Sequence, residues 1–126
     1  MELEAHMANV GAARRFVRQE LAGRAPDEAV SDLMLATSEL VTNAFEHGSQ
    51  RPVRLTVRSN RDGASITVAS GTEGSRVPDV EEWTTARVDH ISGRGLGIVR
   101  GIADDIDVER SDGGVAITVH RRFAGA

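Results

Sequence analysis

The sequence contains no cysteine and no tyrosine, and its aromatic side chains are limited to one tryptophan and three phenylalanines. Without cysteine the chain has no disulfide, no thiolate metal site and no cysteine nucleophile. So few aromatic side chains also argue against the stacking platforms that bind single-stranded nucleic acid. No apolar run reaches the roughly 18–20 residues that a membrane-spanning helix needs, and the first residues, MELEAHMANV, lack a secretion-signal pattern. We therefore expect a cytoplasmic protein with no membrane segment.

The charge balance limits the partners further. With 15 basic and 19 acidic side chains the net charge is −4, whereas binding to the phosphates of a nucleic acid requires a basic face. The 126 residues, 40% of them hydrophobic, suffice for one core but not for two. The sequence thus predicts a single domain over residues 1–126 that binds no nucleic acid.

The hydrophobic pattern has a helical period in the first part of the chain. It predicts a helix over about residues 9 to 23, with Asn9 as its N-cap, and a longer helix over about residues 26 to 47. Pro26 opens the second helix and Gly48 ends it, which are favoured places for these two residue types.

Alternating patterns predict strands elsewhere in the chain. A short strand is expected in residues 2–6, and two hairpins with Asp-Gly turns are expected in residues 53–70 and 105–123. Residues 71–92 show no period, and loops of that length are usually functional. A third helix follows at about residues 94–104. Paired strands and grouped helices favour an α+β two-layer sandwich.

The stretch SELVTNAFEHG places Glu39, Asn43 and His47 at strict four-residue intervals. At about 100° per residue they form a polar stripe at the edge of the apolar face. Groups at such an edge are partly withdrawn from water and hold a ligand strongly. An amide oxygen suits a magnesium ion that carries phosphates, and a carboxylate one turn away can deprotonate an attacking hydroxyl. Ordinary boundary residues remain the alternative.

The stretch SGRGLGIVRGIADD places Gly93, Gly95 and Gly97 before or at the start of the third helix. Backbone amides at a helix N-terminus form an anion site, and glycine lets that backbone approach a phosphate closely. The spacing is that of neither a dinucleotide motif nor a Walker loop. Flexibility at the end of the long loop is the alternative explanation.

Together these motifs resemble those of the GHKL (Bergerat-fold) ATPases, and among them the small anti-sigma-factor serine kinases of Gram-positive and actinobacterial bacteria. ARRFVRQEL is similar to their first helix, SELVTNAFEHG to their N-box, and GRGLGIVRGIADD to their glycine-rich second box. The resemblance spans nearly the whole chain. It implies a two-layer α/β sandwich with a mixed, mainly antiparallel sheet and a long lid over the ATP.

The resemblance also implies roles for individual positions. Glu39 matches the catalytic base and Asn43 the Mg²⁺ ligand, while Arg94 would help to hold phosphate or be an exposed structural residue. The implied nucleotide-binding positions are Asn43, His47, Ser70, Thr72, Gly74, Gly93, Arg94, Gly95, Leu96 and Gly97.

One position departs from the family pattern. The first glycine box of the family reads D-x-G-x-G, and its Asp accepts the adenine amino group. Here Ser70 stands in the place of that Asp, and Thr72 in the place of a glycine. Replacing a charge-assisted hydrogen bond by a neutral one is expected to cost on the order of 1–3 kcal/mol of binding free energy.

Three functions follow from these observations. The first is an anti-sigma factor with ATP-dependent protein serine kinase activity, which uses ATP and Mg²⁺ to phosphorylate a small anti-anti-sigma protein of the STAS type and sequesters a sigma factor. The second, motivated by Ser70, is a non-catalytic anti-sigma module with weak or lost nucleotide binding. The third is the ATP-binding part of a histidine-kinase system, which the short chain disfavours. The resemblance also suggests a homodimer.

The remaining polar residues carry less information. The four histidines show no metal-binding spacing, and Trp83 is expected to anchor the lid or contact a partner rather than stack on a base. Arg14, Arg15 and Arg18 are expected to form a solvated face, with an acidic partner as the alternative.

Overall fold

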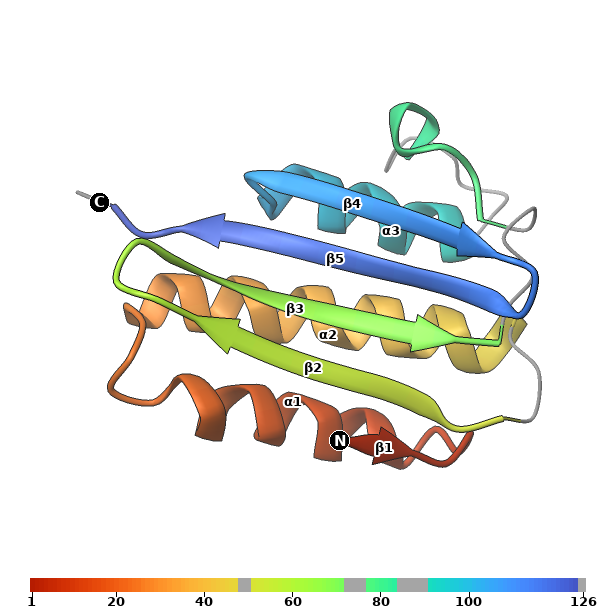
Figure 1. Ribbon diagram of the computed structural model, residues 1–126, viewed down its shortest axis with the longest axis horizontal. Helices are drawn as coiled ribbons and strands as arrows, with labels where there is room; N and C mark the ends of the chain where they lie inside the picture. Colours follow the sequence, from red (N-terminus) through yellow and green to blue (C-terminus); the bar gives the residue numbers. More distant parts are fainter. Residues whose placement is uncertain (48–50, 72–76, 84–90, 125–126) are drawn as a thin grey trace.

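The computed structural model of the chain describes residues 1–47, 51–71, 77–83 and 91–124 (Figure 1). None of the helices in these ranges combines the length and the apolarity needed to cross a membrane. In chain order the elements are β1 (Glu2–Leu3), α1 (Asn9–Leu21), α2 (Asp27–His47), β2 (Val53–Ser59), β3 (Gly63–Ser70), the 3₁₀ turn η2 (Val80–Glu82), α3 (Ile91–Ile102), β4 (Asp105–Ser111) and β5 (Gly114–Arg122).

The strands form one sheet in the order β1-β2-β3-β5-β4. Both predicted hairpins are present, and β3 pairs with β5 over its whole length, which joins the two hairpins into one sheet. A mixed, mainly antiparallel sheet was expected, but every described strand pair is antiparallel. The reason is that β3 and β5, the inner strands of the two hairpins, run in opposite directions.

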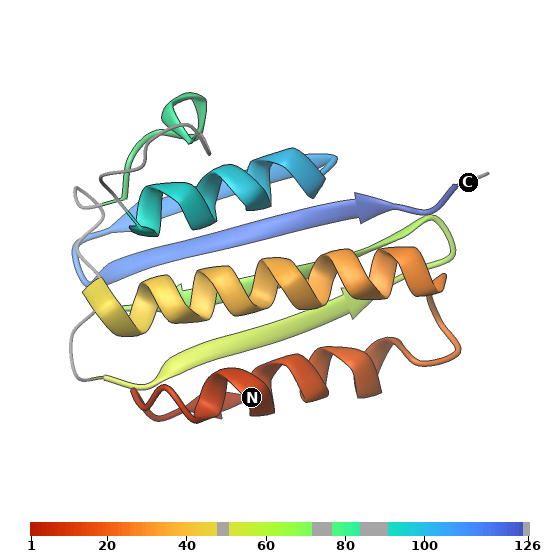
Figure 2. The same ribbon diagram turned by 180° about the vertical axis from the view of Figure 1, so that it is seen from behind.

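All three helices lie on one face of this sheet, with α2 between α1 and α3 (Figure 2). The core lies between the two layers, because the apolar face of each helix and alternate residues of each strand point into it. Its fully buried side chains include Val17, Leu33, Leu40, Leu55, Ile66, Leu96, Val99 and Val119. This arrangement confirms the predicted α+β two-layer sandwich.

The start of α1 and the length of β1 differ from the prediction. Asn9 is the first residue of α1 rather than its N-cap, and its amide Nδ2 donates to the carbonyl of Glu4, 2.9 Å away. The N-cap position is Ala8, whose side chain has no hydrogen-bond acceptor, so α1 begins without a side-chain cap. The predicted strand in residues 2–6 is shortened to Glu2–Leu3 by the same loop.

The turn between α1 and α2 depends on glycine. Gly23 has φ 74°, a left-handed conformation that other residues rarely adopt. Pro26 then precedes α2, and its carbonyl accepts the amide of Val30 at 3.0 Å. This begins a 21-residue helix that crosses the sheet and ends at His47, as predicted. Gly48, its expected terminator, lies outside the described residues.

Arg121 joins the helical layer to the sheet near the start of α2. Its guanidinium donates to Asp32 of α2 at 2.9 Å and to Asp104, just before β4, at 3.0 Å. The hydrogen bond with Asp32 and that with Asp104 raise the pKa of Arg121. The backbone amide of Arg122 and then the guanidinium of Arg121 lower the pKa of Asp104 below its usual value.

Candidate functional site

The edge of α2 carries two polar side chains one turn apart. The side chains of Glu39 and Asn43 are both half-buried. The Oδ1 atom of Asn43 is itself buried and has no hydrogen-bond partner among the described residues. An unsatisfied buried acceptor of this kind costs about 1–3 kcal/mol. A ligand that donates to this oxygen, or a hydrated cation that it coordinates, would recover that cost.

Glu39 lies directly against the backbone of α3. A Cβ atom built on Gly95 would stand 2.5 Å from Glu39 Oε2 and 3.4 Å from Glu39 Cδ. Any larger residue at position 95 would therefore displace the carboxylate. The sequence left two explanations open for this glycine, phosphate approach or flexibility. The structure adds a third: glycine at position 95 leaves room for the Glu39 carboxylate beside α3.

The glycine-rich stretch is helical rather than a loop before the helix. α3 begins at Ile91, not near residue 94, so that Gly93, Gly95 and Gly97 all lie within its first two turns. Only the first amides of an α-helix are free of intrahelical bonds. The expected amide anion site therefore narrows to the first turn, which holds Gly93 and Arg94, while the amides of Gly95 and Gly97 belong to the helix. The side chain of Arg94 lies outside what the structure describes.

Ser70 is the last residue of β3, at the end of the sheet where α2 also ends (Figure 1). β5 starts beside it, and a Cβ atom on Gly114 would collide with the carbonyl oxygen of Ser70. Glycine at position 114 thus permits the two strands to pair up to their ends. Thr72 and Gly74, the other predicted residues of this segment, lie outside the described residues.

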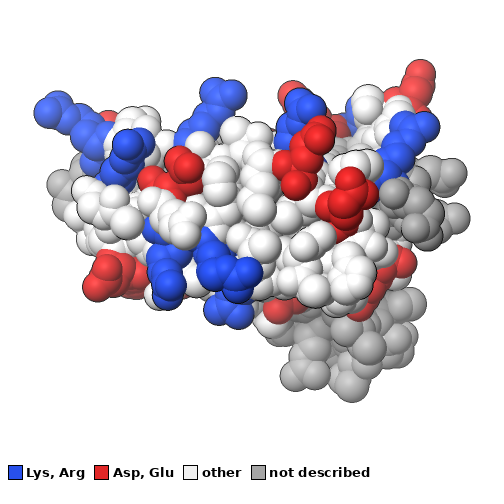
Figure 3. All heavy atoms as spheres, turned by 90° about the horizontal axis from the view of Figure 1, so that it is seen from below, with Lys and Arg blue, Asp and Glu red and all other residues white. Residues whose placement is uncertain are grey.

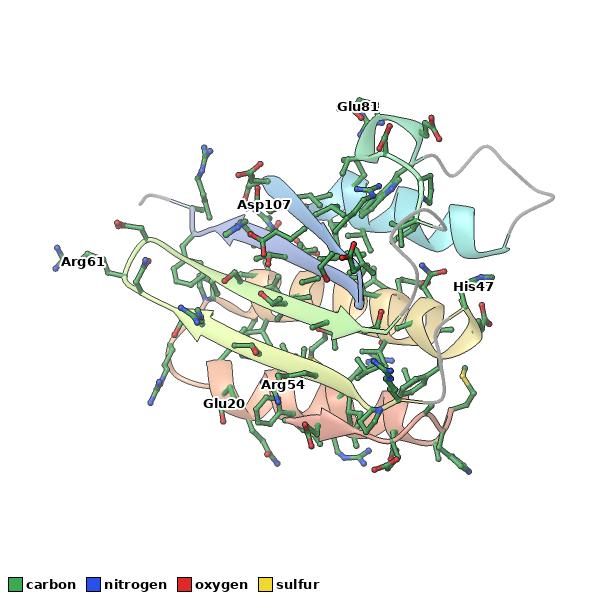
Figure 4. The ribbon with its side chains drawn as sticks, turned by 45° about the vertical axis from the view of Figure 1, so that its right-hand side comes forward. Glu20, His47, Arg54, Arg61, Glu81 and Asp107 are labelled. Atoms are coloured by element: carbon green, nitrogen blue, oxygen red, sulfur yellow. The ribbon has the colours of Figure 1, made fainter. Side chains whose placement is uncertain are left out.

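His47 and Leu96 were also predicted to bind the nucleotide, but their surroundings differ from those of Glu39 and Asn43. His47 is the last residue of α2, with an exposed side chain 4.0 Å from the carboxylate of Glu46 (Figure 4). Leu96 is 1% exposed, so its side chain belongs to the hydrophobic core. Neither side chain is among the atoms that a Cβ at Gly95 would meet, and a nucleotide role for Leu96 is restricted to its backbone.

A hollow of about 520 Å³ lies at the opposite end of the sheet, around the turn between β2 and β3. Figure 4 shows Arg61 in this turn and His47 at the other end of the molecule. Asn60, Asp105 and Arg122 are among the residues that line it, and no residue of the polar stripe is. This hollow is therefore separate from the predicted nucleotide site.

The spacing of the histidines in the sequence did not reveal one group of potential metal ligands among the described residues. Asp105, Asp107 and His120 offer ligand atoms within 4.8 Å of one another on the outer side of β4 and β5. His120 Nε2 lies 3.1 Å from Asp107 Oδ2. The strand register brings these residues together, as Asp105 pairs with His120, although they are far apart in sequence. They lie on the face of the sheet opposite α2 and belong to no part of the predicted site.

The profile of the family described as "Histidine kinase-like ATPase domain" matches residues 3–121. The chain belongs to this family. The match includes both Glu39 with Asn43 and the glycine-rich start of α3, and it confirms the resemblance to the GHKL ATPases. Membership of an ATPase family implies that the chain binds a nucleotide.

Sequence relatives of the ATPase domain are named anti-sigma F factors. The protein of Thermoanaerobacter sp. (strain X514) is 26% identical over 105 residues, which cover 79% of this chain and 73% of the relative. The protein of Caldanaerobacter subterraneus subsp. tengcongensis is 26% identical over 104 residues, which cover 78% of this chain and 73% of the relative.

Solved structures share the fold of the ATPase domain. The RsbU and RsbW domains of Rv1364c from Mycobacterium tuberculosis superpose with a TM-score of 0.66 and 20% identity over 98% of this chain. The chain spans only 31% of that protein's length. The catalytic domain of the histidine kinase ThkA gives a TM-score of 0.59 and 15% identity, covering 91% of this chain and 92% of that domain.

The polar side chains at the edge of α2 are of a type that fits a Mg²⁺ ion with a bound nucleotide. The buried Oδ1 of Asn43 is a hard, neutral oxygen without a described partner, which is the type of ligand that hydrated Mg²⁺ takes alongside phosphate oxygens. The carboxylate of Glu39 lies one turn away. The other walls of the expected nucleotide site, residues 72–76 and 84–90, lie outside the described residues.

Proposed function

We propose that this domain is an anti-sigma factor that binds ATP with Mg²⁺ and phosphorylates a serine of a small anti-anti-sigma protein of the STAS type. The observation that carries the proposal is the pair on α2: the carboxylate of Glu39, which lies against Gly95, and the Oδ1 of Asn43 one turn later, which has no hydrogen-bond partner among the described residues. The names of the sequence relatives support the anti-sigma role. The same domain would sequester a sigma factor in a cytoplasmic complex.

The residues divide the chemistry between them. Asn43 would hold Mg²⁺, which neutralises the phosphate charge during phosphoryl transfer. Glu39 orients the attacking serine hydroxyl and accepts its proton as the serine oxygen bonds to the γ-phosphorus, while the bond from that phosphorus to the bridging oxygen breaks and ADP leaves. The backbone of Gly95 restricts where the Glu39 carboxylate can lie. A base with a restricted position loses less freedom when the serine arrives.

Phosphate transfer from labelled ATP to a candidate anti-anti-sigma protein tests the proposal. Glu39→Gln keeps the shape of the side chain but removes the base, and it should reduce transfer by about 10²–10⁴-fold. Glu46→Gln is the matched control, because Glu46 lies two turns later on the same helix with an exposed side chain. Absence of phosphoserine with the unsubstituted protein, or undiminished transfer by Glu39→Gln, contradicts the kinase activity.

A second function is supported by Ser70. This residue ends β3 where the family carries the Asp that accepts the adenine amino group. A domain with weak or lost nucleotide binding would regulate sigma factors by sequestration alone. Calorimetric titration with ATP and Mg²⁺ separates the two functions: a heat-silent titration at millimolar nucleotide, together with retained sigma-factor binding, favours the non-catalytic module. Sedimentation of the purified chain tests the proposed homodimer.

A further inference from the structure

Residues 77–83 form an ordered element within the stretch that shows no sequence period. Both of its ends are buried: Val77 is 5% exposed and Trp83 is 2% exposed. Trp83 Nε1 donates to the carbonyl of Pro78 at 2.9 Å, which closes the segment into a compact loop around η2. The burial of Trp83 agrees with its expected role as an anchor.

Two arginines from different elements hold this segment. Arg110 of β4 donates from Nη2 to the carbonyl of Val77 at 2.8 Å and to that of Pro78 at 3.4 Å, and it lies 3.4 Å from Asp79 Oδ1. Arg100 of α3 donates from Nη1 to the carbonyl of Glu81 at 2.9 Å and to that of Trp83 at 3.4 Å. We call Arg100, Arg110 and residues 77–83 the arginine clasp.

The chemistry of the clasp explains why arginine occupies both positions. An irregular segment leaves backbone carbonyls without partners, and a buried carbonyl without a partner is unfavourable. A guanidinium presents several N–H donors in a planar fork and can serve more than one carbonyl at once. The hydrogen bonds are also charge-assisted, which makes them stronger than those between neutral groups.

The clasp connects to the candidate site through α3. This helix carries both Arg100, which contacts residues 77–83, and Gly95, which lies against Glu39. The side chains of Leu96 and Val99, between these two positions, are buried in the core with Trp83. Displacement of residues 77–83 would therefore remove packing from the same helix that restricts the Glu39 carboxylate.

We propose that Arg100 and Arg110 are positioning residues: by holding residues 77–83 on α3 and β4, they fix α3 where Gly95 meets Glu39. This proposal rests on the proposed kinase function, because the consequence of the contact is the placement of the base. The two arginines act through α3 and do not touch the reacting groups.

The single tryptophan of the chain makes the clasp directly measurable. Since Trp83 lies within the held segment, its fluorescence reports on that segment alone. The double variant Arg100→Gln/Arg110→Gln should shift the emission to longer wavelength and increase quenching by acrylamide. Arg54→Gln is the matched control, because Arg54 is an exposed strand arginine that forms an ion pair with the exposed Glu2. Unchanged emission and quenching in the double variant would contradict the claim that the two arginines hold residues 77–83.

Kinetics test the positioning role at a temperature where circular dichroism shows every variant folded. The double variant should lower kcat by about tenfold or more while the KM for ATP changes little, since a small misplacement of a catalytic group is costly. The single variant Arg110→Lys keeps the positive charge but lacks the planar set of N–H donors of a guanidinium. It should retain more activity than Arg110→Gln. A folded double variant with unchanged kcat overturns the proposal. Absence of phosphate transfer in the unsubstituted protein defeats the kinase function and this role together, whereas the fluorescence result still decides the clasp.

Discussion

Gly95 of α3 and Glu39 of α2 are so close that a single added Cβ atom would stand 2.5 Å from the carboxylate oxygen Oε2. The contact joins the two sequence motifs that define the candidate site. It gives the glycine a steric role that is separate from any contact with phosphate. Because the contacted atom is the far end of a flexible side chain, substitution at 95 should move Glu39 rather than unfold the domain.

We therefore expect Gly95→Ala to reduce phosphate transfer without loss of stability. Displacing the carboxylate by about 1 Å should cost up to roughly 10²-fold in rate, while alanine in place of a helical glycine stabilises by at most about 0.5–1 kcal/mol. Gly101→Ala is the control in the same helix, because no atom of the described residues lies within 4 Å of a Cβ at that position. Equal activity of the two variants, measured with labelled ATP, contradicts the steric role.

Asn43→Ala should weaken nucleotide binding in the presence of Mg²⁺ and leave the stability unchanged or higher. The reason is that the variant removes a buried oxygen without a described partner, and deleting such a group relieves about 1–3 kcal/mol of desolvation cost. Ser38→Ala is the control, since Ser38 Oγ is also buried without a partner among the described residues and lies outside the stripe. Calorimetry with and without EDTA gives the affinity, and urea unfolding gives the stability. A substantial loss of stability in Asn43→Ala would show that the amide is structural.

Local pattern was sufficient to predict most of the fold and the polar stripe. The period of the apolar residues located α2 and its Glu39–Asn43 edge, and the Asp-Gly turns located both hairpins. These features depend on residues a few positions apart, so that the sequence contains them directly. The family profile then confirmed the fold class that the motifs had indicated.

The features that the pattern missed depend on contacts between distant residues. The contact of Gly95 with Glu39 and the bonds of Arg110 to residues 77–79 each join segments at least thirty positions apart. The start of α3 at Ile91 was also missed, because Gly93 and Gly95 have low helix propensity and made these positions look like a loop. Packing on α2 and the core overrides that propensity.

Ser70→Asp should raise the affinity for ATP. A carboxylate at the end of β3 would provide the charge-assisted acceptor that the family uses for the adenine amino group, and the gain should be about tenfold or more. GTP has no amino group at the corresponding position of its base and should gain nothing. Calorimetric titration of both nucleotides makes the comparison, with Ser70→Asn as a neutral acceptor of similar shape. Equal gains for ATP and GTP contradict an adenine-binding role for position 70.

Arg121→Gln should destabilise the domain and reduce its sensitivity to acid. The substitution removes bonds of 2.9 Å to Asp32 and 3.0 Å to Asp104, and hydrogen bonds between charged groups contribute about 1.5–3 kcal/mol each at most. Arg54→Gln should cost less than about 1 kcal/mol, because its ion pair with Glu2 is exposed.

Asp104 makes the free energy of unfolding depend on pH. Its pKa in the folded protein lies below the usual value of 3.8, so the unfolded chain takes up the proton first as the pH falls. The stabilisation is fully present above the usual value and is lost as the pH falls through the lowered pKa of the folded state. Asp104→Asn removes this dependence, and Arg121→Gln weakens it, because the Arg121 guanidinium follows the Arg122 backbone amide among the groups that lower the pKa of Asp104. Urea unfolding between about pH 6 and pH 3 measures the slopes; parallel curves for the unsubstituted protein and Asp104→Asn would exclude Asp104 as a source of acid sensitivity.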